Sequence, residues 1–206
     1  MMPMEQKTLI QDAMEFAAMK HAGQRRKGGT IPYLAHVIEV MEAVCRMTED
    51  EEIRAAAVLH DTLEDTETTR EELLERFGER VTAMVSAESE NKRKDRPAED
   101  TWLIRKKETV DHLAQAPTDI RMIALADKLS NVRAMVRDYR VIGDALWKRF
   151  HNADPVQQGK YYGLLAHAFE QDENLCGTPA YREFRDLCTE LFGAGFDRDC
   201  DLFANA

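Results

Sequence analysis

The sequence predicts an all-α fold, built mainly as one multi-helix domain. Apolar residues recur at three- and four-residue spacing along several segments, as a buried helix face requires. Polar breaks with glycine, proline or capping residues separate these segments. Few stretches alternate between polar and apolar residues, so few strands are expected. The chain has 206 residues, which is enough for one domain with a substantial buried core.

The first half of the chain is expected to hold several short helices. Between the first two lies a glycine-rich, basic segment, residues 23–32, which ends in proline and should be a loop. Thr69 and Glu72 match a capping box, and Gly78 should stop the helix that begins there. The helices expected in this half cover residues 7–21, 34–47, 51–61, 70–77 and 81–85.

The second half is expected to begin with a loop and to end in a capped helix. Residues 88–100 are densely charged and have no apolar face, so an exposed, mobile loop is expected there. Thr178 and Pro179 match an N-cap and a first-turn proline for a last helix that ends near Gly193. The other helices expected here cover residues 102–113, 120–129 and 156–169. Residues 1–171 are expected to form the domain, and residues 172–206 a helical extension packed on it.

The composition limits the partners and the compartment. The formal net charge is −10, from 38 acidic and 28 basic residues, which argues against a nucleic-acid binder with a basic face. A small anionic substrate remains compatible with this charge. The N-terminus lacks the basic and apolar regions of a secretory signal, and no stretch is apolar enough to span a membrane. With four scattered cysteines and no C-x-x-C pair, a cytoplasmic protein is expected.

The pair His60-Asp61 is the sharpest local feature, because it follows the apolar run AAAVL. Glu64 lies four residues after His60, and Asp65 lies four residues after Asp61. On a helix, residues at this spacing share one surface. Acids clustered beside an imidazole near an apolar segment are costly unless a cation compensates them. The pattern therefore indicates a metal site.

Two further residues complete a set of four candidate ligands. His36 begins the second expected helix, and Asp127 lies in the apolar segment IALADKLSNV, where a bare carboxylate is unusual. Two imidazoles and two carboxylates suit Mn²⁺ or Fe²⁺, whereas Zn²⁺ is less favoured without thiolates. A metal with open positions would polarise a phosphoryl oxygen and lower the pKa of bound water. The alternative is a buried polar network without metal.

The chain resembles the HD-domain hydrolases of the Rel/Spo homologue group, specifically the free-standing small alarmone hydrolases. Four motifs carry the resemblance, in the family's order and at about its spacing. They are HAGQRRKGGTIPYLAH at residues 21–36, HDTLEDT at 60–66, RFGERVTAMV at 76–85 and ADKLSNV at 126–132. The resemblance implies an HD fold over residues 1–171, Mn²⁺ binding, and removal of the 3′-pyrophosphate from guanosine tetra- and pentaphosphate.

The resemblance also implies roles for individual residues. The implied metal ligands are His36, His60, Asp61 and Asp127. The implied catalytic pair, which positions or deprotonates the attacking water, is Glu64 and Asp65. The implied substrate-binding residues are Arg26, Lys27, Asn131 and Tyr161.

Some positions depart from the family pattern and leave the substrate open. Val37 stands where many relatives have proline, the first loop is about one residue shorter, and the tail after Gln171 matches nothing in the family. Loops shape base and phosphate pockets, so a phosphatase of NADPH or another nucleotide is one alternative. A non-catalytic nucleotide sensor is another, although Glu64 and Asp65 argue against it because a pure binder needs no catalytic acids.

Overall fold

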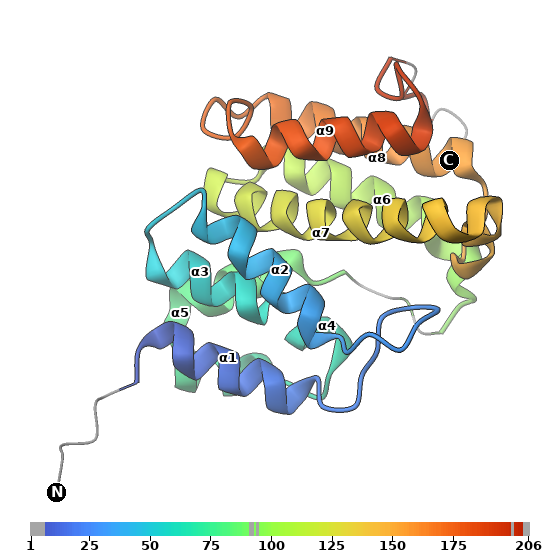
Figure 1. The fold of residues 1–206 in the computed structure, drawn as a ribbon. Helices are drawn as coiled ribbons and strands as arrows, with labels where there is room; N and C mark the ends of the chain where they lie inside the picture. Colours follow the sequence, from blue (N-terminus) through green and yellow to red (C-terminus); the bar gives the residue numbers. More distant parts are fainter. Residues whose placement is uncertain (1–6, 91–92, 94, 199, 204–206) are drawn as a thin grey trace, which may run out of the picture. The chain divides into compact units, whose positions relative to one another are not determined.

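Helices form all the regular secondary structure in the described part of the chain. The computed structural model describes residues 7–90, 93, 95–198 and 200–203, and Figure 1 shows them as a ribbon. Outside the helices, a single isolated bridge joins Arg25 and Pro32 among the described residues. The predicted all-α class is therefore confirmed. The chain divides into two units, residues 1–89 and 90–206.

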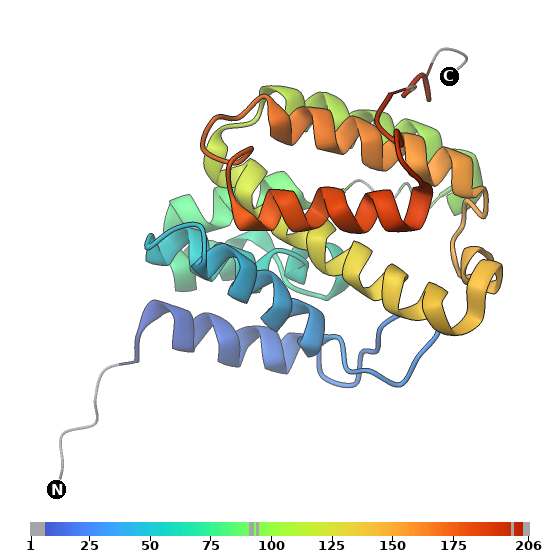
Figure 2. The ribbon, with the colours of Figure 1, turned by 45° about the horizontal axis from the view of Figure 1, so that its top comes forward.

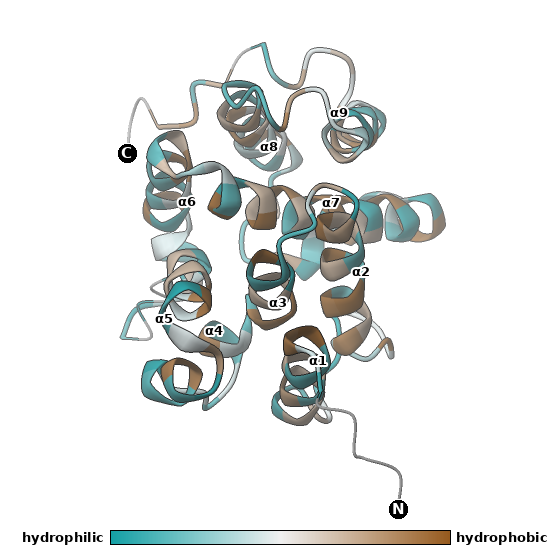
Figure 3. Cartoon of the chain, turned by 90° about the vertical axis from the view of Figure 1, so that its left-hand side faces the viewer, coloured by the Kyte–Doolittle hydropathy of each residue, from teal (hydrophilic) through white to brown (hydrophobic). Residues whose placement is uncertain are grey.

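The first unit is built around the alanine-rich helix α3. This helix packs against α1, α2 and α5, and its Ala55, Ala56 and Ala57 side chains are buried. Small side chains let the neighbouring helices approach closely, and Figure 3 shows hydrophobic residues, coloured brown, along α1, α2 and α3. The helices of this unit are α1 (Leu9–Lys20), α2 (Leu34–Cys45), α3 (Glu51–Leu59), α4 (Thr62–Asp65) and α5 (Arg70–Glu88).

The capping signals of the first unit act as the sequence predicts. The Thr69 hydroxyl accepts a hydrogen bond from the Glu72 backbone N–H at 3.2 Å, which satisfies one free donor at the start of α5. At Gly78 the backbone leaves the helical region, with φ 82° and ψ 176°. Glycine adopts this conformation without the steric cost that other residues meet. The chain resumes its helix after this kink, so the expected stop is a sharp bend within α5.

The second unit joins long helices through an aromatic core. In Figure 2, α8 lies between α6 and α9, and α7 packs against α9 and the 3₁₀ segment. Phe184 of α9 contacts both Tyr162 and Phe169 of α8, at ring-centroid distances of 6.0 and 5.7 Å. Its elements are α6 (Ala98–Gln115), α7 (Thr118–Ile142), η1 (Gly143–Arg149), α8 (Pro155–Glu170) and α9 (Pro179–Phe192).

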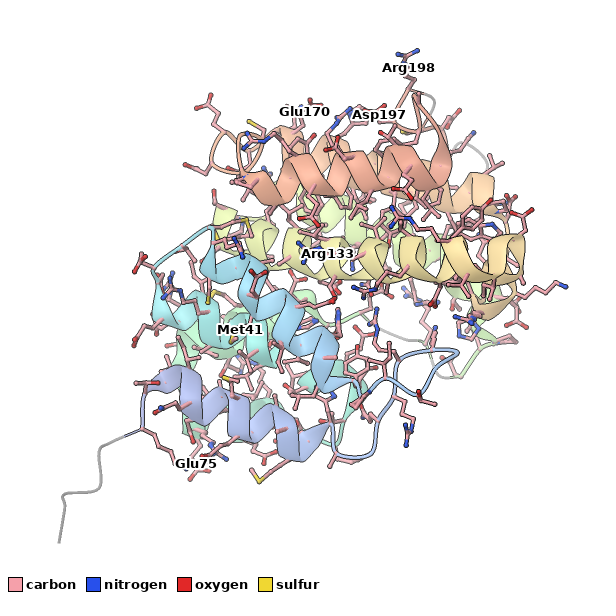
Figure 4. The ribbon with its side chains drawn as sticks, in the orientation of Figure 1. Met41, Glu75, Arg133, Glu170, Asp197 and Arg198 are labelled. Atoms are coloured by element: carbon pink, nitrogen blue, oxygen red, sulfur yellow. The ribbon has the colours of Figure 1, made fainter. Side chains whose placement is uncertain are left out.

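The last helix, α9, begins and ends where the sequence predicts. The Thr178 hydroxyl accepts from the Tyr181 backbone N–H at 3.1 Å, Pro179 opens the first turn, and Gly193 ends the helix with φ 91°. Arg133 of α7, labelled in Figure 4, forms a two-bond ion pair with Glu183 of α9 at 2.7 and 2.6 Å. The separation of residues 172–206 as an extension stays a prediction, although α9 packs on α7 and α8.

The charged segment 88–100 differs from its expected form as an exposed loop. Helix α5 includes Glu88, and α6 begins at Ala98. Glu90 is half-buried because its carboxylate accepts from Arg105 at 2.8 Å and from Lys106 at 2.6 Å. Asn91, Lys92 and Lys94 lie outside the described residues. The expectation of exposure is therefore wrong at Glu90, because complementary charge on α6 compensates its burial.

Two more boundaries differ from the sequence prediction. Helix α6 starts at Ala98 instead of Trp102, and α7 continues to Ile142 well beyond the expected apolar segment. The residues added to α6 are mostly polar, whereas the addition to α7 buries Val132, Met135 and Val136. These three residues continue the apolar helical spacing, so the longer helix was recognisable in the sequence. Among the described helices, none combines the length and the hydropathy needed to cross a bilayer.

Candidate metal centre

The first unit brings two buried imidazoles together in an edge-to-face arrangement. His36 lies in the first turn of α2, and His60 follows the last residue of α3. Their Nε2 atoms are 3.3 Å apart, and only 3% and 2% of the two residues is exposed. Two buried nitrogens that both point at one place need a shared proton or a cation between them.

Asp61 adds a carboxylate to the same place. The helix breaks at this residue, where φ is −96° and ψ is 0°. Its Oδ2 atom lies 2.9 Å from His60 Nε2 and 3.4 Å from His36 Nε2. Burial opposes ionisation, but the charge of His60 and the hydrogen bonds from both imidazoles hold the pKa of Asp61 well below its usual value. The carboxylate is therefore ionised, as a metal ligand must be.

The backbone of α3 fixes which nitrogen of His60 carries a proton. His60 Nδ1 lies 2.8 Å from the carbonyl oxygen of Ala57. A carbonyl only accepts hydrogen bonds, so Nδ1 carries the proton that it donates. Nε2 then has a lone pair for a metal whenever the ring is neutral. This is the arrangement found in metal-binding histidines, whose second nitrogen is held by a carbonyl or carboxylate. His36, His60 and Asp61 thus supply converging donors of the types that suit a divalent ion.

The two predicted catalytic acids follow directly on the short helix α4. Glu64 and Asp65 are both half-buried, and the Asp65 backbone N–H donates to the Asp61 carbonyl at 2.9 Å. The side-chain amide of Gln24 donates to the Asp65 carbonyl oxygen at 2.7 Å. The break after α3 therefore keeps both acids in the turn next to the His60-Asp61 pair. Their catalytic role stays a prediction.

The basic loop between α1 and α2 forms a narrow turn. The Arg26 backbone N–H donates to the Ile31 carbonyl at 2.9 Å, and Gly28 has φ 72°, a value that glycine adopts readily. The Arg26 guanidinium lies 5.8 Å from the centre of the Tyr33 ring, while Lys27 is exposed. The turn thus presents both predicted phosphate-binding side chains, one of them stacked on Tyr33.

Tyr33 is a site residue that sequence reasoning missed. Its hydroxyl donates to Asp61 Oδ2 at 2.5 Å. Tyr33 is the N-cap residue of α2, three residues before His36, and residues at this spacing lie close together at the start of a helix. That spacing within the segment PYLAH is the signal that could have identified it.

In the second unit, Asp127 is a buried carboxylate on α7. It is 7% exposed, and its two oxygens accept from Lys128 Nζ at 2.6 Å and from Asn131 Nδ2 at 2.7 Å. Although burial opposes protonation, Asp127 raises the pKa of Lys128 well above its usual value. The structure therefore brings Asp127 and Asn131 together as predicted neighbours on α7. Their metal and nucleotide roles stay predictions.

Tyr161 also lies in the second unit and is 4% exposed. Its buried hydroxyl has no hydrogen-bond partner within the described part of the chain, and Lys106 Nζ lies 5.1 Å from its ring centre. Lys106 also pairs with Glu90. Burial opposes ionisation of Glu90, but Lys106, Lys128 and Arg105 lower its pKa to about 2. Sequence reasoning missed Glu90 because it treated the whole segment as solvated.

Comparison with known proteins identifies the family. The family model described as HD domain matches residues 13–156, which is more than half of the chain. The chain belongs to the HD domain family. Residues His36, His60, Asp61 and Asp127 all lie within the matched range of this HD-domain protein.

Curated relatives match about three fifths of the chain. The chain is 40% identical over 126 residues to a guanosine-3′,5′-bis(diphosphate) 3′-pyrophosphohydrolase of Aquifex aeolicus, covering 61% of this chain and 18% of that protein. It is 36% identical over 133 residues to the protein of that name, MESH1, of Danio rerio, covering 63% of this chain and 70% of that protein. The match thus spans less than a fifth of the first relative and most of the second.

A solved structure shares the fold. It is described as a metazoan ortholog of SpoT that hydrolyzes ppGpp, and it matches with a TM-score of 0.67. The match covers 92% of this chain and 99% of that chain at 22% identity. At this identity the match supports the fold of the HD-domain protein and nothing finer.

Proposed function

We propose that this HD-domain protein is a metal-dependent phosphohydrolase that removes the 3′-pyrophosphate from guanosine tetra- and pentaphosphate. The products are pyrophosphate with GDP or GTP. The convergence of His36, His60 and Asp61 on one point carries the proposal, because the Nε2 and Oδ2 atoms lie within 2.9 to 3.4 Å of one another. The relative from Danio rerio, named for this reaction and 36% identical, supports the choice of substrate.

The proposed metal is Mn²⁺, with Fe²⁺ or Zn²⁺ as alternatives, and Asp127 is the fourth proposed ligand. Mn²⁺ accepts imidazole and carboxylate ligands together. When bound, the ion would polarise a phosphoryl oxygen and make water a better nucleophile. The buried carboxylate of Asp127 in the segment ADKLSNV, which matches the family motif, supports its inclusion.

The chain's own residues orient the substrate and move the proton. Glu64 and Asp65 orient a water molecule and accept its proton as the water oxygen bonds to the phosphorus attached to the ribose 3′-oxygen. The bond between that phosphorus and the 3′-oxygen breaks, and the 3′-oxygen takes up a proton. Arg26 and Lys27 neutralise the phosphates.

The substrate-binding groups of the second unit complete the proposal. Asn131 contacts the nucleotide, and Tyr161 contributes a hydroxyl that lacks an internal partner within the described residues. A small nucleotide is the proposed ligand, not a nucleic acid or a membrane, in agreement with the net charge of −10. The proposed compartment is the cytoplasm.

Product analysis tests this function. Protein loaded with Mn²⁺ is incubated separately with guanosine tetraphosphate and with NADPH, and the products are resolved by anion exchange. We expect GDP and pyrophosphate from the first substrate, and loss of both on chelation or in Asp61→Ala. Phosphate release from NADPH alone would show that the enzyme acts on a nucleotide other than guanosine tetraphosphate. Nucleotide binding without turnover of either compound would favour a sensor and contradict the proposal.

A further inference from the structure

We infer that Tyr33 is a positioning residue that holds the proposed ligand Asp61 in place and supports the Arg26 guanidinium. One side chain would thus join the metal centre to the phosphate-binding loop. The inference rests on the proposed function for the roles of Asp61 and Arg26. Its own basis is the set of contacts that surround the Tyr33 ring and hydroxyl.

The hydroxyl of Tyr33 contacts Asp61 directly. It donates to Oδ2 at 2.5 Å, the same oxygen that lies 2.9 Å from His60 Nε2. A hydrogen bond to an ionised acceptor is shorter and stronger than one between neutral groups. The bond therefore restricts rotation of the carboxylate and sets the direction in which its remaining lone pairs point.

The ring of Tyr33 is held by its neighbours, so the hydroxyl has little freedom to move. The His21 ring stacks on it with centroids 4.9 Å apart and planes 29° apart. The His36 ring meets it edge-on at 5.4 Å. The Arg26 guanidinium lies over it at 5.8 Å. Tyr33 thus contacts the proposed ligand His36 through its ring and the proposed ligand Asp61 through its hydroxyl.

His21 forms a fixed support for this ring. It is 3% exposed, and its Nδ1 lies 2.8 Å from the side-chain oxygen of Gln24. Its Nε2 is buried without a hydrogen-bond partner in the described part of the chain. An unsatisfied buried nitrogen is costly and calls for an explanation. The stacking of His21 on Tyr33 accounts for the ring being held at this place.

Gln24, which is hydrogen-bonded to His21, also joins Tyr33 to the turn that carries Glu64 and Asp65. Its carbonyl accepts from the Tyr33 backbone N–H at 3.0 Å, and its side-chain amide donates to the Asp65 carbonyl at 2.7 Å. Hydrogen bonds and ring stacking therefore connect the base of the loop to the Tyr33 ring and to the turn after His60. Displacing the ring would disturb both the metal ligand and the loop.

Two substitutions separate the roles of the hydroxyl and the ring. Tyr33→Phe keeps the stacking but removes the bond to Asp61, and groups that orient metal ligands are worth about 10- to 100-fold in metal affinity. We expect Mn²⁺ to bind about tenfold more weakly, with KM for guanosine tetraphosphate unchanged at saturating Mn²⁺. Tyr33→Leu also removes the support for Arg26, so KM should rise about two- to fivefold in addition.

Mn²⁺ binding to metal-free protein, without nucleotide, gives a readout independent of activity. Isothermal titration with Mn²⁺ is compared for the wild type, Tyr33→Phe and Tyr139→Phe. Tyr139 is a matched control, because its hydroxyl donates to Asp144 at 3.1 Å on the exposed surface of the second unit. We expect weaker binding in Tyr33→Phe alone, with its circular dichroism spectrum unchanged.

Three results would overturn the inference. Wild-type affinity in Tyr33→Phe would show that the hydroxyl does not position Asp61. A lower unfolding temperature with unchanged Mn²⁺ affinity would reduce Tyr33 to a structural residue. Absence of Mn²⁺ binding by the wild type would overturn both this inference and the proposed function. Mn²⁺ binding without turnover of guanosine tetraphosphate would instead remove the substrate assignment and leave the positioning role of Tyr33 supported.

Discussion

The two units of the chain surround their buried or half-buried carboxylates with different chemical groups. In residues 1–89, Asp61 contacts two imidazoles and a tyrosine hydroxyl. In residues 90–206, Asp127 contacts the ammonium of Lys128, and Glu90 contacts the cationic groups of Arg105 and Lys106. The second unit thus supplies permanent positive charge to its carboxylates. The first supplies two imidazoles and a hydroxyl, none of which carries a permanent charge.

This difference teaches where an external cation is needed. A buried carboxylate is stable when a cation and good hydrogen bonds compensate its lost hydration. In the second unit, Lys128 pairs with Asp127, and Arg105 and Lys106 pair with Glu90. The first unit instead gathers a carboxylate and two imidazole nitrogens whose lone pairs suit a divalent ion. The central claim is therefore that the cluster of His36, His60 and Asp61 is completed by a metal.

Removing a proposed ligand should have the largest effect on activity. Asp61→Ala should lower kcat/KM for guanosine tetraphosphate by about a thousandfold or more, because the metal contributes several kcal/mol of charge stabilisation. Steady-state hydrolysis assays with Mn²⁺ measure this effect. Asp144→Ala, which changes an aspartate beside Tyr139, is the control and should keep wild-type activity. Activity within tenfold of wild type in Asp61→Ala would count against the ligand assignment.

Removing Asp127 should have the largest effect on the stability of metal-free protein. The change Asp127→Ala leaves Lys128, whose side chain is 18% exposed, without its carboxylate at 2.6 Å. Breaking such a pair costs about 3 kcal/mol, because the remaining charge loses its ion-pair partner. Urea unfolding in the presence of a chelator measures the loss.

The double variant Asp127→Ala/Lys128→Met sharpens that test. It removes both charges, so most of the lost unfolding free energy should return. Equal losses in the single and double variants would show that the ion pair does not stabilise the second unit in the way its geometry indicates.

The pH dependence of stability should reveal Glu90. Its folded-state pKa is about 2, against an ordinary value of 4.5. Because the folded pKa is depressed, its stabilising effect is complete above pH 4.5 and is lost as pH falls from 4.5 towards 2. With allowance for partial exposure, the contribution is about 2 kcal/mol.

The variant Glu90→Gln isolates this contribution from the other carboxylates. It should be less stable than the wild type at pH 6, and the difference should shrink as the pH approaches 2. Urea unfolding curves across this range provide the measurement. A difference that stays constant with pH would contradict the assigned role of Lys106 and Arg105 around Glu90.

The smallest effects should be the same in both units. Thr69→Ala and Thr178→Ala each remove a hydroxyl that accepts from a backbone N–H, at 3.2 and 3.1 Å. Each should cost about 1 kcal/mol of unfolding free energy. Chemical denaturation of the two variants tests this expectation, and replacement by serine provides the control that keeps the cap. Clearly unequal losses would show that the units differ in more than their buried charges.

The sequence predicts much of the fold because its signals are local. The helix starts at Thr69 and Thr178 and the backbone change at Gly78 depend on residues within a few positions. The cluster of His36, His60 and Asp61 is recognisable because it combines a compact motif with a family pattern. The burial of Glu90 was not predictable in this way, because its partners Arg105 and Lys106 lie 15 and 16 residues further on.

The role of Tyr33 shows a second limit of sequence reasoning. Its contact with Asp61 joins residues 28 positions apart, and a tyrosine before a helix is common without any function. Only the packing of α2 against α3 places the hydroxyl at the carboxylate. The extent of α7 was missed for a different reason, because Val132, Met135 and Val136 continue the apolar helical spacing and are buried, so a local signal was present in the sequence.

A titration of metal-free protein with Mn²⁺ tests the central claim most directly. The unfolding temperature is followed for the wild type and for Asp61→Ala. Binding to the folded state stabilises by about 2.7 kcal/mol at a hundredfold excess over Kd, so the wild type should show a clear, saturable rise and the variant should show none. An unfolding temperature that is insensitive to Mn²⁺ in the wild type, or an equal rise in both proteins, would contradict the claim that a metal completes this cluster.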